Sequence, residues 1–128
     1  MINFKEVRSA NHLKKILANK EKYLDGIRFA IDPSNVNKFK KVISKSVIDR
    51  LKINLNLMYL SEWYNDFKKI QYVFKNLPKN IETLSFVDSY GAMSPYMIDF
   101  FFNKIENKYS QLYNYGCHFH NNCGLALA

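Results

Sequence analysis

Short apolar segments typical of β-strands alternate along this chain with longer segments of helical periodicity. The strand centres Phe29, Leu55, Phe86 and Phe119 follow one another at intervals of 26, 31 and 33 residues. Strands that alternate with helices at such intervals form right-handed βαβ units, in which the strands run parallel. The pattern therefore predicts an α/β fold with a parallel sheet whose strands are in sequential order, with helices on its outer face.

The expected strands cover residues 26–31, 53–58 and 83–88, and a fourth strand contains His118 and His120. The expected helices cover residues 9–24, 36–47, 61–77 and 95–109, each with apolar residues recurring every three to four positions. Ser61 and Ser94 precede two of these helices and are typical N-cap residues. We expect residues 1–25 to form a helical lead-in segment and residues 26–128 to form the sheet-containing domain.

The composition is that of a globular domain and gives no sign of membrane insertion. Hydrophobic residues make up 48% of the 128 residues, enough for a substantial core. The sequence contains no apolar run near the roughly 20 residues that span a bilayer, and no signal peptide is evident at its start. Cys117 and Cys123 are the only cysteines and form no disulfide framework, so we expect a cytoplasmic location.

The net charge of +8 raises the question of a nucleic-acid partner. Lysine supplies 16 of the 19 basic residues, and most lysines fall on the polar faces of the expected helices. No nucleic-acid recognition motif accompanies them. The charge therefore indicates a solvated surface without a nucleic-acid or membrane partner, and a specific anion partner is the alternative.

Polar residues gather where the expected strands end. They are Asp32, Asn56, Asp88, Ser89, His118 and His120. The carboxyl ends of parallel strands lie along one edge of the sheet, where α/β proteins carry their functional groups. The sequence therefore predicts a site at this edge.

The histidine pair His118 and His120 is the first candidate for a metal site. Alternate side chains of a strand share a face, so both imidazoles should point the same way and Cys117 the other way. Two imidazoles on one face can bind a divalent cation, although such histidines also occur as hydrogen-bonded core residues. A zinc knot formed by Cys117, His118, His120 and Cys123 is a further alternative.

Two motifs extend this reasoning to a family. Residues 87–95 read Val-Asp-Ser-Tyr-Gly-Ala-Met-Ser-Pro, and residues 118–126 read His-Phe-His-Asn-Asn-Cys-Gly-Leu-Ala. Together they resemble the metal-dependent superfamily of 3-hydroxy-3-methylglutaryl-CoA lyase and the pyruvate carboxyltransferase domain, whose fold is a TIM barrel. The first motif is most similar to that of 4-hydroxy-2-oxovalerate aldolase. The resemblance extends from about residue 26 to the end and implies strands four to seven of a (β/α)8 barrel, with residues 1–3 as the tail of strand three.

The resemblance also implies an activity and a set of site residues. The activity is aldolase or lyase chemistry at a carbon–carbon bond beside a 2-oxo acid, and a Claisen-type acyltransferase is the alternative. His118 and His120 would bind Mn²⁺, Mg²⁺ or Zn²⁺, which stabilises an enolate. Asp88 and Ser89 would be catalytic, and Ser89, Asn56 and Arg28 would bind the substrate.

The general base is open, with Tyr90, Asp88 and Asp32 as candidates. The alternative for Asp88 is a structural role, in which its carboxylate accepts hydrogen bonds from the backbone at the end of its strand.

One part of the family pattern is missing from the sequence. The family's first strand carries an Asp-Arg-Glu-type motif that supplies a metal ligand and an arginine, and no such motif occurs here. We therefore expect a piece of a barrel that is inactive in isolation, with another chain or a second copy supplying further strands. An inert remnant of such an enzyme is the alternative.

Overall fold

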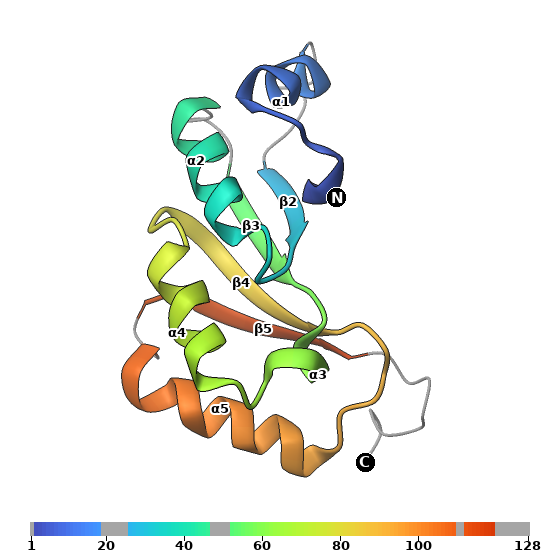
Figure 1. Ribbon diagram of the computed structural model, residues 1–128, viewed down its shortest axis with the longest axis vertical. Helices are drawn as coiled ribbons and strands as arrows, with labels where there is room; N and C mark the ends of the chain where they lie inside the picture. Colours follow the sequence, from blue (N-terminus) through green and yellow to red (C-terminus); the bar gives the residue numbers. More distant parts are fainter. Residues whose placement is uncertain (1, 19–25, 47–51, 110–111, 120–128) are drawn as a thin grey trace.

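The sheet of the computed structural model, which describes residues 2–18, 26–46, 52–109 and 112–119, has five strands that are all parallel. The strands are β1 (Ile2–Asn3), β2 (Gly26–Ile31), β3 (Lys52–Leu57), β4 (Ile81–Asp88) and β5 (Asn114–Phe119). They lie in the order β1-β2-β3-β4-β5 (Figure 1). The predicted α/β class and the sequential parallel order are thus confirmed, with the two-residue β1 preceding the four expected strands.

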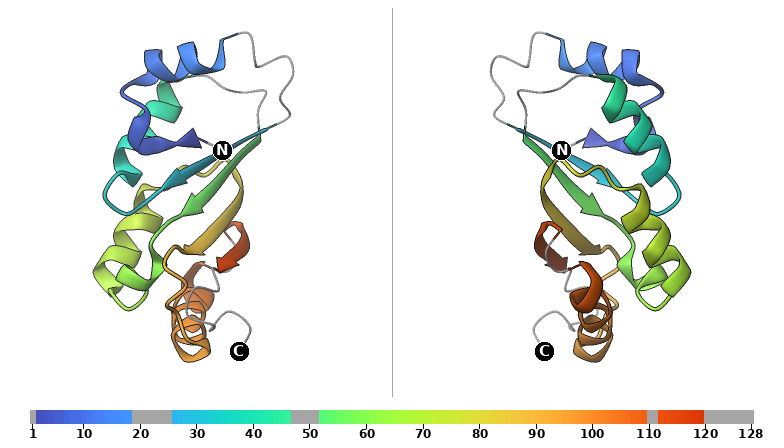
Figure 2. Two further views of the ribbon diagram at one scale, coloured as in Figure 1. Left: turned by 90° about the vertical axis from the view of Figure 1, so that its right-hand side faces the viewer. Right: turned by 90° about the vertical axis from the view of Figure 1, so that its left-hand side faces the viewer.

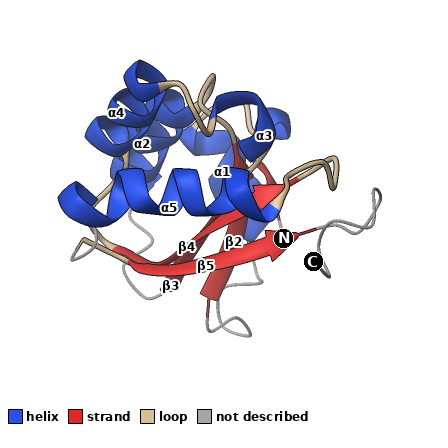
Figure 3. Cartoon of the chain, turned by 90° about the horizontal axis from the view of Figure 1, so that it is seen from below, coloured by secondary structure: helices blue, strands red, loops and turns tan. Residues whose placement is uncertain are grey.

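The described helices all lie on one face of this sheet, and none of them lies on the other face (Figure 3). They are η1 (Phe4–Glu6), α1 (Ala10–Leu17), α2 (Val36–Ser46), α3 (Leu60–Trp63), α4 (Phe67–Asn76) and α5 (Pro95–Tyr109). Within the described residues β1 and β5 form the two edges of the sheet, so the barrel-like arrangement is not closed (Figure 2). We call the uncovered side the open face.

The core lies between the sheet and the helices. Every second residue of the central strands points into it, as Ile53, Leu55 and Leu57 of β3 do, because successive side chains of a strand alternate between faces. On the helix side of the sheet, Phe86 of β4 packs edge-on against Phe101 of α5, with ring centroids 4.7 Å apart. Burial of such aromatic side chains helps to hold the helix layer on the sheet.

One predicted helix is wrong in detail. Residues 61–77 form two helices, α3 and α4, because Asp66 begins a new helix by accepting a hydrogen bond at Oδ1 from the backbone N–H of Lys69, at 3.1 Å. Ser61 lies inside α3 and does not cap it. Phe67, the first residue of α4, is apolar and yet 46% exposed.

The segment that precedes β2 also differs from a simple helix. Only Ala10–Leu17 of the expected helix 9–24 is described as helical; its N-cap is Ser9, and residues 19–25 lie outside the described part. Phe4 and Leu13 of this segment are fully buried in the same core as the sheet. The boundary at residue 25 stays a prediction. None of the described helices combines the length and the apolar character that crossing a membrane requires.

Candidate functional site

The open face of the sheet is lined by polar side chains. In parallel strands, residues in register point to the same side, which gives rows across the sheet. The first row contains Arg28, Asn54, Thr83 and Asn114; the second contains Asn56, Ser85 and Gly116. Such a surface can hold a polar ligand.

Arg28 and Asn56, both predicted to bind substrate, are in contact. Arg28 Nη1 donates a hydrogen bond to Asn56 Oδ1 at 2.8 Å. The backbone partner of Arg28 on β3 is Asn54, two residues before Asn56. The Arg28 side chain therefore leans along the sheet by about 7 Å toward its carboxyl edge. A guanidinium from the middle of β2 is thus brought near the edge where a site is expected.

The neighbouring polar residues of the open face hold one another in place. Thr83 Oγ1 donates a hydrogen bond to Asn54 Oδ1. Gly116 leaves room for its neighbour, since a Cβ at this position would lie 2.8 Å from Ser85 Oγ. These contacts fix the surface beneath the Arg28–Asn56 pair.

His118 lies on the open face at the carboxyl end of β5. Tyr115, three positions earlier, stacks on Phe86 with ring centroids 5.9 Å apart and so faces the helices. The alternation of a strand then directs Cys117 to the helix side and the exposed His118 to the open face, in register with Val87.

The metal site stays a prediction, because part of it lies outside the described residues. His120 and Cys123 both do, so the expected pairing of His118 with His120 and the alternative zinc knot are not described. Among the residues that are described, no three His, Cys, Asp or Glu side chains are grouped so that they could hold a metal. Burial raises the pKa of the Cys117 thiol, which disfavours the thiolate that binds metals.

Asp88 is buried and holds the loop that follows β4. Its Oδ1 accepts a hydrogen bond from the backbone N–H of Ala92 at 3.1 Å, and its Oδ2 accepts one from that of Met93 at 3.0 Å. Its exposed fraction is 2%. This environment matches the structural alternative that the sequence left open, and no contact here assigns Asp88 a part in proton transfer.

Ser89 joins the loops that follow β3 and β4. Its Oγ accepts a hydrogen bond from the backbone N–H of Tyr59 at 2.9 Å. Tyr59 has φ 61° and ψ 38°, a left-handed conformation that is costly for a residue with a large side chain. Strain of this kind, about 1–3 kcal/mol, is maintained only where surrounding contacts enforce it. Ser89 provides one such contact.

Tyr59 lies among residues of which the sequence indicates Ser89 and Tyr90 but not Lys5 or Glu62. Its ring lies 5.7 Å from that of Tyr90, and Lys5 Nζ lies 5.2 Å from its centroid. The Tyr90 hydroxyl donates a hydrogen bond to Glu62 Oε1 at 3.1 Å, and this bond is the main cause of a raised Tyr90 pKa. Tyr59 and Glu62 carry no motif, so only the fold reveals this cluster.

A cavity of about 450 Å³ lies beside this cluster at the carboxyl edge. Its lining includes Lys5, Asp32, Glu62, Trp63 and Lys69. Asp32, a candidate base, is largely buried: its Oδ1 accepts hydrogen bonds from the backbone and hydroxyl of Ser34, and its Oδ2 lies 3.7 Å from Lys5 Nζ. These contacts hold Asp32 in the turn between β2 and α2.

The predicted site residues therefore fall into three groups. Arg28 and Asn56 touch each other on the open face, and Asp88 and Ser89 secure the loop after β4. His118 lies two strands from Asn56 and two residues nearer the carboxyl edge, a separation of about 12 Å along the sheet.

Comparison with known proteins relates this arrangement to an aldolase. No protein-family model matches the chain, and no curated protein matches it. A similar solved structure is described as "the N-terminal domain of a putative aldolase from Bacteroides vulgatus". The sequences are 25% identical and the TM-score is 0.68, with 99% of this chain and 41% of the other chain covered. This chain therefore has an aldolase-like fold and spans less than half the length of that domain.

Proposed function

We propose that this chain serves an aldolase-type reaction in which a carbon–carbon bond beside a 2-oxo acid is formed or cleaved, as in a 4-hydroxy-2-oxo-acid aldolase. The observation that carries the proposal is the Arg28–Asn56 pair on the open face of a parallel sheet whose fold is aldolase-like. The membership of the 3-hydroxy-3-methylglutaryl-CoA lyase-like superfamily that the motifs predict belongs to this proposal.

Arg28 is the proposed carboxylate-binding residue. A guanidinium has five N–H donors in a planar fork and pairs with a carboxylate through two parallel hydrogen bonds. The bond from Nη1 to Asn56 restrains the plane of this fork and directs it toward the carboxyl edge. Asn56 is therefore a positioning residue, because it acts on the substrate by orienting Arg28.

His118 and His120 are the proposed ligands of a divalent cation, Mn²⁺, Mg²⁺ or Zn²⁺. A catalytic metal site commonly uses about three protein ligands. Of the two proposed ligands only His118 belongs to the described part of the chain, and that part does not contain a complete metal site. Such a cation, when bound, would stabilise the enolate of a 2-oxo acid. His118 contributes an exposed imidazole on the same face as Arg28.

Ser89 and Asp88 support the edge on which the substrate would lie. Ser89 holds the backbone of Tyr59, and Asp88 holds that of Ala92 and Met93. The ends of β3 and β4 are thereby kept in one arrangement, and a preorganised site loses less free energy on binding.

Binding of pyruvate, followed by isothermal titration calorimetry in the presence of Mg²⁺, tests the role of Arg28. We expect Arg28→Ala to weaken binding about tenfold, as loss of a charge-assisted hydrogen bond does, and Arg28→Lys to restore only part of it. Arg8→Ala is the matched control, because it removes the same charge from an exposed position outside the sheet. Equal affinity of the Arg28→Ala and Arg8→Ala variants would refute the assignment.

Exchange of the pyruvate methyl protons in D₂O, followed by ¹H NMR, tests the enolate chemistry itself. We expect exchange at the uncatalysed rate from this chain alone, and metal-dependent exchange once a chain that carries the missing barrel strands is added. His118→Ala should strongly reduce the exchange by the combined chains. Exchange that stays at the uncatalysed rate in combined chains that bind both pyruvate and Mg²⁺ would refute aldolase-type chemistry for this chain.

A further inference from the structure

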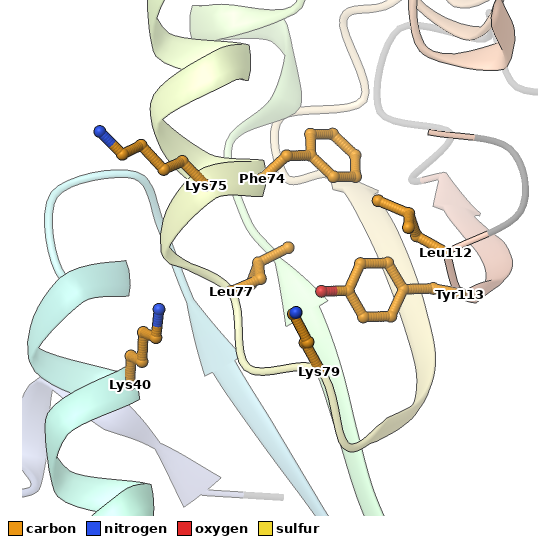
Figure 4. A pocket seen from close by; sticks show the side chains of 7 residues that line it. All are labelled: Lys40, Phe74, Lys75, Leu77, Lys79, Leu112 and Tyr113. Atoms are coloured by element: carbon orange, nitrogen blue, oxygen red, sulfur yellow. The ribbon is translucent and has the colours of Figure 1, made fainter. Parts of the chain in front are cut away.

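A second cavity, of about 490 Å³, lies at the opposite edge of the sheet, where the strands begin. Side chains from α2, from the end of α4, from the loop before β4 and from the segment before β5 line it (Figure 4). They are Lys40, Phe74, Lys75, Leu77, Lys79, Leu112 and Tyr113. The volume is in the range of small-molecule pockets, about 300–1,000 Å³.

One wall of this cavity is apolar and firmly held. Phe74, Leu77, Leu112 and Tyr113 point toward one another (Figure 4). Phe74 stacks on Tyr109 with ring centroids 4.1 Å apart. The Tyr113 hydroxyl donates a hydrogen bond to the carbonyl oxygen of Pro78 at 3.0 Å, which fixes the ring. A wall fixed in this way can receive a flat apolar group with little reorganisation.

The charged residues that line the cavity from the described part of the chain are all cationic. They are Lys40, Lys75 and Lys79, and no acidic residue of that part lines it. The ion pairs between described residues join Lys5 to Asp32 and Lys52 to Glu82, so neither involves a lysine of this cavity. Figure 4 shows Lys40 and Lys79 beside the apolar group, whereas Lys75 extends away from it. Positive charge without a partner next to an apolar wall favours an anion that has an apolar body.

We propose that this amino-edge cavity binds a small organic anion that carries an aromatic ring, such as an aryl phosphate or an aryl carboxylate. The ring would lie against Phe74, Leu77 and Tyr113, and the anionic group would contact Lys40 and Lys79. The site is separate from the open face and does not depend on the aldolase proposal. An anion partner is also the alternative explanation for the excess of lysine in the sequence.

Titration with phenyl phosphate, followed by ¹H–¹⁵N NMR at 150 mM salt, tests the proposal. We expect saturable shifts of the amides of residues 74–79 and 112–113, and affinity at least about tenfold higher than for inorganic phosphate or benzyl alcohol. The Lys40→Ala/Lys79→Ala variant should bind about tenfold more weakly, since two exposed ion pairs with the anion are lost. Leu112→Ser, at an exposed position of the apolar wall, should also weaken binding without unfolding the protein.

The matched control is Lys14→Ala/Lys15→Ala, which removes the same charge from exposed positions of α1. Equal weakening by the two double variants would show attraction by net charge alone and would overturn the proposal. Equal affinity for inorganic phosphate and phenyl phosphate would overturn the role of the apolar wall. Absence of saturable shifts in residues 74–79 and 112–113 would overturn the site itself.

Discussion

Replacement of Asp88 tests the view that this carboxylate secures the loop between β4 and α5. Its two oxygens accept one backbone hydrogen bond each, from Ala92 and Met93, and the side chain is almost completely buried. Each buried N–H that is left without an acceptor costs about 1–3 kcal/mol. Asp88→Ala should therefore lower the free energy of unfolding by about 2–6 kcal/mol. Asp88→Asn keeps one acceptor and should lower it by about 1–3 kcal/mol.

Urea denaturation followed by fluorescence measures these losses. Trp63 is the single tryptophan and is buried against Phe101, so its emission reports unfolding near β4 and α5. With a slope of about 1–3 kcal/mol per M urea, a loss of 3 kcal/mol moves the midpoint by roughly 1–3 M. Asp99→Asn, at an exposed position of α5, is the control and should leave the midpoint unchanged. An Asp88→Ala midpoint equal to that of the native chain would refute the structural role of this residue.

Three further predictions concern close packing and pH. Gly26→Ala should lower the free energy of unfolding by about 1–3 kcal/mol in the same urea assay, because its Cβ would lie 2.8 Å from the backbone oxygen of Lys52. Gly116→Ala should cost less, because the Ser85 hydroxyl that it meets can rotate; a larger loss than that of Gly26→Ala would contradict this. Burial is the main cause that raises the pKa of Tyr115 from 10.0 to about 12, so its contribution to stability is full below pH 10 and is lost as the pH rises to about 12. Urea midpoints measured across this pH range should therefore fall less steeply for Tyr115→Phe than for the native chain.

The arrangement of strands and helices could be predicted because it depends on local patterns. Alternating apolar residues in β2, β3 and β4 show which face each strand buries, and the intervals between these strands require parallel crossovers. The turn formed by Asp32, Pro33 and Ser34 after β2 also follows from residue types that favour turns. The same rules place polar residues at the carboxyl edge, which is why the sequence alone indicates that Asn56, Ser89 and His118 lie near it.

The interruption between α3 and α4 shows where local patterns fail. Apolar residues keep a helical period through residues 61–77, yet the chain turns at Asp66, since Trp63 Nε1 donates a hydrogen bond to the carbonyl oxygen of Met58 and its ring packs on Phe101. The contact between Trp63 and Phe101 joins residues that are distant in sequence, and periodicity carries no information about it.

The sequence by itself determined the class of fold, the order of the strands and the edge at which polar groups collect, because these follow from periodicity and chirality. Only the tertiary structure decided what each polar group contacts. Arg28 reaches Asn56 because the register of β2 and β3 brings them together, and Asp88 is used by the backbone because its loop folds over it. The basic cavity around Lys40 and Lys79 likewise exists only where α2 and α4 meet the start of the sheet. Contacts of this kind depend on distances across the folded chain, which no local pattern specifies.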